Sequence, residues 1–163
     1  ESLGLLAAAM RGLHRAQSSP EAEVQVLRAS SIYETAPWGL DAQPDFLNSA
    51  LEIRTRLTPI GLLIWAKAVE KKMGRRLAAR NAPRVIDVDI LLYGREQVNE
   101  PGLAIPHAGL TERPFVIVPL AELARHLVHP VTGQPVSRLR DCVPGCEDVR
   151  WWGDPPTAGA LGA

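Results

Sequence analysis

Two aspartates separated by one residue stand in a strongly strand-like segment, Arg84-Val85-Ile86-Asp87-Val88-Asp89-Ile90-Leu91-Leu92. Successive side chains of a strand point to opposite faces, so Asp87 and Asp89 share one face and lie roughly 6–7 Å apart. Like charges at this spacing repel each other unless a cation lies between them. Carboxylate oxygens on a rigid strand suit Mg²⁺, which commonly takes one or two carboxylates together with substrate phosphates. The pattern predicts a magnesium site, whereas an isolated Asp-x-Asp is more often an ordinary solvent-facing pair.

Basic side chains flank this segment on both sides: Arg75, Arg76, Arg80 and Arg84 before it, and His107 and Arg113 after it. Arginines beside a divalent cation are the usual equipment for phosphoryl transfer, in which catalysis is mostly positioning and charge neutralisation. Three other interpretations stay open for the arginines: ion pairs with the aspartates, a solvated loop, or a loop that contacts RNA. A lone histidine is more often structural or on the surface than functional.

Aromatic residues suggest where a flat heterocycle could bind. Phe46 and Asn48 share one face of a predicted strand, and Phe115 follows Arg113 closely. Two rings and an amide can hold a heterocycle by stacking and edge hydrogen bonds, although either phenylalanine taken alone is more often an ordinary core residue. The chain has no G-x-x-x-x-G-K-[ST] or G-x-G-x-x-G phosphate loop. Any bound nucleotide must therefore be held by a metal ion and arginines.

The composition excludes several classes of protein. The chain has 163 residues with 18 basic and 18 acidic side chains, which argues against an indiscriminate binder of nucleic acids or membrane surfaces. No apolar run approaches the ~20 residues of a membrane span. Cys142 and Cys146, with His126 and His129 nearby, match no usual zinc finger and are too few for a disulfide framework. We expect a cytoplasmic, reduced protein that binds neither nucleic acid nor membrane and is a monomer or weak oligomer.

The elements that must position these residues follow from periodicity and from breaker residues. We predict helices over residues 3–13, 59–73 (ending at Gly74) and 115–124, and strands over 24–33, 45–57 and 85–93. Loops are expected over 36–44, 75–84 and 101–114, with little regular structure after Pro130. This order predicts an α+β fold, a ferredoxin-like two-layer sandwich with an antiparallel sheet and helices packed on one face, whose first strand is missing from the chain.

These residues, in this order, resemble bacterial hydroxymethyl-dihydropterin pyrophosphokinase, an enzyme of folate synthesis. The matching stretches are Ser31-Ile32-Tyr33-Glu34-Thr35, Gln43-Pro44-Asp45-Phe46-Leu47-Asn48, residues 70–75, residues 82–94, Ile105-Pro106-His107, Arg113-Pro114-Phe115 and Pro119-Leu120. The most specific part is P-R-x-I-D-x-D-I-L with the downstream P-H and R-x-F. The likeness implies a pyrophosphokinase domain over residues 1–133 and an irregular C-terminal tail over 134–163.

The resemblance implies a reaction in which the pterin hydroxymethyl oxygen attacks the β-phosphorus of ATP and AMP leaves. It implies that two Mg²⁺ ions bind at Asp87 and Asp89, and that Asp87 also lies near the attacking hydroxyl. The further roles that it implies are phosphate contacts by Arg75, Arg84, His107 and Arg113, and pterin binding by Thr35, Trp38, Phe46, Asn48 and Phe115. Glu70 matches a family acid to which the sequence assigns no role. Residues 36–44 and 74–84 match loops that close over the substrates.

The chain departs from the family pattern at several positions. The N-terminal strand with its glycine-containing turn is not recognisable, so we expect about ten more residues before Glu1 in the native protein. Asn81 replaces a frequent tryptophan, Ala108 replaces a frequent aromatic residue, and Gly102 and Ala104 stand where some members contact nucleotide. These changes bear on nucleotide affinity more than on metal binding. Two alternatives stay open: an RNA-binding ferredoxin-like module and a metal-dependent phosphohydrolase.

Overall fold

The computed structural model describes residues 2–9, 24–36, 46–77 and 87–155. Its elements are β1 (Ser2–Ala9), β2 (Val24–Ala29), β3 (Ile32–Thr35), β4 (Phe46–Thr55), α1 (Pro59–Leu77), β5 (Val88–Tyr93), β6 (Val98–Glu100), β7 (Leu103–Ile105), η2 (Ala108–Thr111), α2 (Pro114–Ala124), α3 (Val136–Cys142), η3 (Cys146–Asp148) and β8 (Arg150–Gly153). In this part of the chain the main sheet has the order β5-β1-β4-β3-β8, with β2 also paired to β4, and its pairs are antiparallel. The predicted α+β class with an antiparallel sheet is confirmed.

The first element is a strand, and the predicted helix over residues 3–13 is wrong. β1 pairs with β4 along its whole length and with β5 on its other side, so it is an inner strand. The prediction that the first strand is missing is therefore also wrong, and the expectation of about ten further residues loses the reason behind it. Leucines and alanines favour a helix locally, but pairing on both edges outweighs an intrinsic preference of a few tenths of a kcal/mol per residue.

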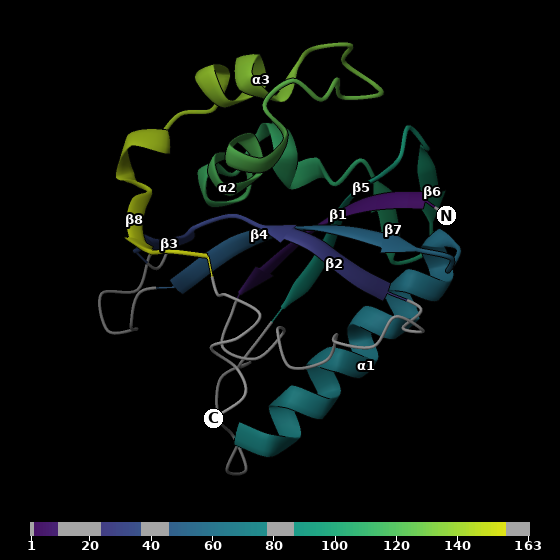
Figure 1. Cartoon of the computed structure of the whole chain (residues 1–163). Coiled ribbons are helices and arrows are strands. Elements are labelled where there is room, and N and C mark those ends of the chain that lie inside the picture. Colours follow the sequence, from purple (N-terminus) through teal and green to yellow (C-terminus); the bar gives the residue numbers. More distant parts are fainter. Residues whose placement is uncertain (1, 10–23, 37–45, 78–86, 156–163) are drawn as a thin grey trace.

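Helices cover both faces of the sheet, which corrects the predicted two-layer arrangement with helices on one face. Figure 1 shows α1 on one side and α2 with α3 on the other. Leu51 and Ile53 of β4 pack in a core with Leu62 and Ala66 of α1. A second core joins β5 to α2 and α3 on the opposite face and includes Leu92. The alternation predicted for residues 45–57 is thus confirmed.

The helix α1 begins as its sequence predicts and ends later. The Thr58 hydroxyl accepts a hydrogen bond from the Gly61 amide at 3.1 Å, and Pro59 occupies the first helical position. The helix continues through Gly74 to Leu77, so the predicted end at Gly74 is wrong and Arg75 belongs to the helix. A glycine inside a helix costs only about 1 kcal/mol, and the arginines and leucine that follow it are good helix formers.

Two further predictions need correction. The segment 24–33 holds two strands, β2 and β3, which pair with different parts of β4. The region after Pro130 is more regular than expected: α3 contributes Val136 and Leu139 to the second core, and β8 extends the sheet by pairing with β3. α2 runs unbroken through Pro119, and the helix predicted over residues 115–124 is confirmed. None of the helices in the described ranges is long and apolar enough to span a membrane.

Candidate active site

The sheet topology brings the predicted site residues to one end of the sheet. β4 and β5 run in the same direction on either side of β1, so both begin where β1 ends. Ala7 pairs with Asp89 on one side and with Ala50 on the other, and Ala9 pairs with Asn48. Adjacent strands lie about 4.8 Å apart, so β4 and β5 are separated by about 10 Å. The start of β5 and the start of β4 therefore face one shared space.

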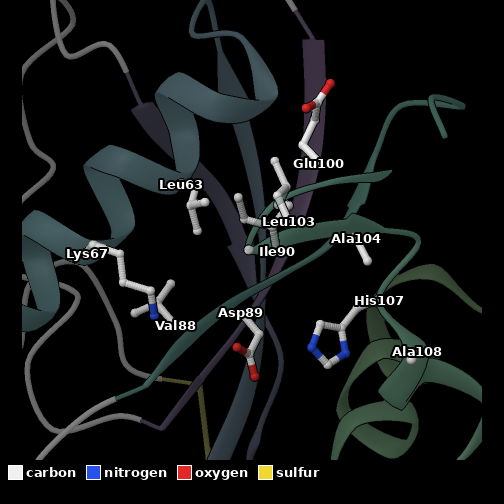
Figure 2. Close-up of a pocket in the computed structure, with 11 residues that line it drawn as sticks. Leu63, Lys67, Val88, Asp89, Ile90, Glu100, Leu103, Ala104, His107 and Ala108 are labelled. Carbon is white, nitrogen blue, oxygen red and sulfur yellow. The ribbon is translucent and has the colours of Figure 1, made fainter. Parts of the chain in front are cut away.

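A cavity of about 370 Å³ opens beside the first residues of β5. Asp89 and His107 both line it, and Figure 2 shows the two side chains near the same end of the cavity. Lys67 of α1 stands on another wall. The remaining lining residues are mostly apolar or small: Leu63, Val88, Ile90, Glu100, Gly102, Leu103, Ala104 and Ala108. An acid, an imidazole and an ammonium group on apolar walls can bind an organic ligand that carries phosphates and a metal ion.

Two backbone-linked contacts hold His107 beside β5. The His107 amide donates to the Leu91 carbonyl at 3.0 Å, and its ring Nδ1 accepts from the Gly109 amide at 3.0 Å. Because Nδ1 is an acceptor, the hydrogen-bond network assigns the N–H of the neutral ring to Nε2. A side chain at position 109 would place Cβ 2.9 Å from His107 Nδ1 and 3.0 Å from Arg113 Cδ. Gly109 therefore permits the two predicted phosphate ligands to approach each other.

Arg113 and Phe115 lie at the N-terminus of α2. Arg113 is the N-cap residue, and its guanidinium carbon lies 6.0 Å from the centre of the Phe115 ring. This is a cation–π distance, and it leaves the guanidinium exposed while the ring packs against the second core. The partial positive charge of the helix N-terminus adds to that of the arginine. This end of α2 is suited to an anionic ligand.

Thr35, Phe46 and Asn48 come together at the ends of β3 and β4. Asn48 Nδ2 donates to Thr35 Oγ1 at 3.1 Å, and Thr35 pairs with Phe46 across the two strands. The Phe46 ring is 48% exposed, far more than a core phenylalanine. Asn48, Asp89 and Glu52 lie on the same face of the sheet, which is the face that α2 covers. On this face Glu52 bonds to Arg28 of β2. An exposed ring beside a fixed amide can stack on and hydrogen-bond to a heterocycle.

Tyr33 stands next to this group, since it pairs with Asn48 across β3 and β4. Its hydroxyl donates to Glu122 Oε2 at 2.9 Å. Burial, followed by this hydrogen bond and the charge of Glu122, raises the pKa of Tyr33 to about 12. Tyr33 therefore stays protonated at neutral pH and fixes β3 against α2.

Glu70 has a role that the sequence did not assign. Its Oε1 accepts a hydrogen bond from the Val88 amide at 2.8 Å, and its carboxylate pairs with Lys67 Nζ at 2.8 Å. Val88 is the residue between the two aspartates. The available signal was the spacing of Leu62, Ala66 and Glu70, which places the acid on the row of α1 that faces the sheet.

Several predicted site residues lie wholly or partly outside the described residues. Arg84 and Trp38 are among them, as are most of the segments expected to close over the substrates (36–44 and 74–84). The backbone of Arg75 lies in the last turns of α1, and its side chain is not described. The roles predicted for these three residues stay predictions.

The donor set at β5 fits a magnesium ion held jointly with phosphates. Within residues 2–9, 24–36, 46–77 and 87–155, no three His, Cys, Asp or Glu side chains cluster as a metal cage. Asp87 is exposed directly before β5, and Asp89 is half-buried at the cavity. Mg²⁺ uses one or two carboxylates and completes its shell with water and phosphate oxygens, so two aspartates suffice. Cys142 and Cys146 are free thiols at the ends of α3 and η3, away from this set.

Comparison with known proteins identifies the family. The model of the 7,8-dihydro-6-hydroxymethylpterin-pyrophosphokinase (HPPK) family matches residues 2–125. The chain belongs to the HPPK family. The resemblance drawn from the sequence motifs is thereby confirmed. HPPK enzymes are pyrophosphokinases that use ATP with magnesium.

The relatives include proteins that this chain covers for the most part and much longer ones of which it covers a small share. The 2-amino-4-hydroxy-6-hydroxymethyldihydropteridine pyrophosphokinase of Bacillus subtilis is 40% identical over 131 residues, which are 80% of this chain and 74% of the relative. The folic acid synthesis protein fol1 of Schizosaccharomyces pombe is 44% identical over 121 residues, 74% of this chain but 16% of that protein. The HPPK-DHPS structure from Plasmodium falciparum matches the fold with a TM-score of 0.64 at 14% identity, covering 86% of this chain and 42% of that one.

Proposed function

We propose that this HPPK chain transfers pyrophosphate from ATP to the hydroxymethyl oxygen of 6-hydroxymethyl-7,8-dihydropterin and releases AMP. One observation carries the proposal: Asp89 and His107 line a single cavity at the sheet end where Asn48 and Thr35 are also joined. The same end thus offers oxygen ligands for a metal ion and an amide for a heterocycle. The names of the relatives, which are pyrophosphokinases of a hydroxymethyldihydropteridine, support the choice of substrate.

ATP binding is assigned to the cavity beside β5. We place the nucleotide between the apolar wall and the small residues Gly102, Ala104 and Ala108, with its phosphates toward Asp89 and His107. The Nε2–H of His107 donates to a phosphate oxygen, because Nδ1 already accepts the Gly109 amide. Arg113, Arg84 and Arg75 add positive charge around the triphosphate, where developing charge is largest.

The pterin is assigned to the neighbouring start of β4. Phe46 and Phe115 stack on its two faces, and Asn48 with Thr35 and Trp38 reads its edge. The exposed Phe46 ring and the Asn48–Thr35 hydrogen bond support this assignment. Strand spacing separates the start of β4 from that of β5 by about 10 Å, which suits two substrates that react end to end.

Asp87 and Asp89 hold magnesium in this proposal, as two ions shared with the triphosphate. Magnesium, when bound, neutralises phosphate charge and helps to align the transferred group. Asp87 also hydrogen-bonds the attacking hydroxyl, which it can reach because it precedes β5 on the exposed side. The remaining parts of the proposal are a monomer or weak oligomer, a cytoplasmic location and catalytic and binding residues that all lie within residues 1–133.

Product analysis tests the proposed reaction. The full chain is mixed with ATP, Mg²⁺ and the pterin alcohol, and the nucleotide products are separated. We expect AMP to form only when the pterin is present. ADP as the product, or phosphate released without the pterin, would contradict the proposal, the latter in favour of a phosphohydrolase. Salt-sensitive RNA binding that ignores Mg²⁺ would favour the RNA-binding alternative.

Asp89→Asn provides the matched variant, because it removes the charge and keeps the size of the side chain. We expect the rate of AMP formation to fall at least about 100-fold, as for loss of a main electrostatic contact. The thermal unfolding midpoint is expected to stay near that of the wild type, since Asp89 is half-buried at a cavity and not in either core.

A further inference from the structure

Among the residues that the structure describes, β5 is the edge strand of the main sheet, and no other described strand of that sheet pairs with its outer side. Two residues from other elements supply the missing partners. Glu70 of α1 accepts from the Val88 amide at 2.8 Å, and the His107 amide donates to the Leu91 carbonyl at 3.0 Å. The outer edge of β5 is thus fixed at two points, and both fixing residues lie close to the proposed metal ligands.

The hydrogen bond between the Glu70 carboxylate and the Val88 amide is shielded from solvent. Its side chain is only 16% exposed, and Val88 is 1% exposed within the first core. The carboxylate makes a charge-assisted hydrogen bond, which is stronger than one between neutral groups. Lys67, the second partner of Glu70, lines the cavity beside Asp89, as Figure 2 shows. The Glu70 carboxylate therefore connects α1 to β5 and to Lys67, which lines the cavity.

We infer that Glu70 is a positioning residue: it holds the Val88 peptide so that Asp87 and Asp89, on either side of it, present their carboxylates together. This inference rests on the proposed function, in which those aspartates bind magnesium. A shift of one peptide plane at Val88 changes the direction of both neighbouring side chains, because they share its backbone. Residues that orient metal ligands from behind typically change metal affinity or activity 10–100-fold when they are removed.

Three substitutions distinguish a positioning role of Glu70 from an effect of its negative charge. Glu70→Ala removes the acceptor for Val88, whereas Glu70→Gln keeps a carbonyl acceptor and removes the charge that pairs with Lys67. Lys71→Ala, at an exposed position of the same helix, controls for the effect of alanine in α1. If Glu70→Ala does not fold, Glu70→Met replaces it, because methionine keeps the length of the side chain and lacks the acceptor.

The measurements are Mn²⁺ binding in the presence of a non-hydrolysable ATP analogue, followed by electron paramagnetic resonance, and hydrogen exchange of the Val88 amide. We expect Glu70→Ala to weaken Mn²⁺ binding about ten-fold or more and to speed Val88 exchange. Glu70→Gln should stay within about three-fold of wild type in Mn²⁺ affinity and keep most of the protection. kcat should fall with Glu70→Ala while the KM for the pterin stays close to that of wild type.

Two outcomes would overturn the inference. One is unchanged Mn²⁺ affinity in the variant that lacks the acceptor. The other is an equal loss in Glu70→Gln, which would assign the effect to charge. The failure of the proposed function is distinguishable, because the wild type would then form no AMP with the pterin. The Mn²⁺ and hydrogen-exchange measurements would still report on the aspartates in that case.

Discussion

His129 is a buried histidine whose hydrogen bonds require it to be neutral. Its Nδ1 accepts from the amides of Val131 at 3.3 Å and Thr132 at 3.2 Å, and it closes the turn that precedes α3. Burial lowers the pKa of His129 below its ordinary value of 6.5. The folded chain therefore binds this proton less readily than the unfolded chain, and the free energy of unfolding falls as the pH drops below about 6.5.

We expect denaturant unfolding to give a lower free energy of unfolding at pH 5.5 than at pH 7.5, and we expect this difference to depend on His129. His129→Gln should lower stability at both pH values and reduce the difference between them. His126→Gln, at an exposed position, is the control and should retain the wild-type pH dependence. A His129→Gln variant that keeps the full pH dependence would disprove this role.

Gly109 leaves room for the side chains of both His107 and Arg113, and it predicts a specific effect on nucleotide binding. Gly109→Ala would force the two side chains apart, because the new Cβ would lie 2.9 Å from one and 3.0 Å from the other. We expect the KM for ATP to rise about ten-fold and stability to fall by about 1–3 kcal/mol, as for overpacking.

Steady-state kinetics and thermal unfolding measure the two effects of Gly109→Ala. Gly153→Ala is the matched control, since a Cβ there meets nothing within 4 Å. An unchanged KM for ATP in Gly109→Ala would show that the placement of His107 and Arg113 around Gly109 does not support nucleotide binding.

At the residue scale, the residues that line the cavity were easier to predict from the sequence than the residues that hold them in place. Asp89 and His107 carry spacing and chemistry that point to a phosphate site, and the structure places both at one cavity. Glu70 could not be assigned, because its partner is a backbone amide 18 residues away. A contact of this kind depends on how a helix docks on a strand, and residue types do not encode it locally.

Glu122 of α2 fixes the position of β3. Its carboxylate accepts from the Ser31 amide at 3.0 Å and from the Tyr33 hydroxyl at 2.9 Å. Glu122→Gln should lower the pKa of Tyr33 from about 12 toward its ordinary 10.0. The fall should be partial, because burial is the larger cause of the shift. The free energy of unfolding should drop by about 1 kcal/mol, as for one weakened hydrogen bond.

Ultraviolet titration of the tyrosines measures this pKa, and the difference from Tyr33→Phe assigns the signal between Tyr33 and Tyr93. Glu147→Gln changes an exposed acid elsewhere and should leave the titration unaltered. A Tyr33 pKa that is the same in Glu122→Gln as in the wild type would refute the negative charge of Glu122 as a cause of the shift.

At the scale of elements, the strands at the site were predicted and the strand that joins them was not. The alternation of residues 45–57 and the β-branched run before Tyr93 indicate β4 and β5 without reference to the rest of the chain. β1 is an inner strand, and such strands are runs of apolar residues that periodicity does not separate from a helix. The spacing of the leucines and alanines in β1 fits the period of a helix, so the sequence predicted a helix where the structure has a strand.

Residues 134–155 belong to the same folded unit as the site. Val136, Leu139 and Val143 pack in the second core with α2, and the predicted domain boundary at residue 133 would remove all three. Each buried aliphatic side chain contributes about 2–5 kcal/mol, so the sum is comparable to the whole stability of a domain. We therefore expect a chain truncated after Gly133 not to fold.

Circular dichroism during heating tests this expectation, with Leu139→Ala as a milder variant that should lose about 2–5 kcal/mol and still unfold cooperatively. A truncated chain that melts within a few degrees of the full chain would mean that residues 134–155 are dispensable. The sequence suggested an irregular tail because this segment is rich in glycine, proline and arginine. The few apolar residues among them determine the packing.

The central position of β1 sets the order in which the sheet can be completed during synthesis. β1 precedes both of its neighbours in the chain, since it pairs with Phe46–Thr55 on one edge and Val88–Tyr93 on the other. Translation must therefore proceed through Tyr93 before β1 has both its neighbours. Contacts between such distant segments slow folding, and an unpaired apolar strand is prone to associate with other chains while it waits.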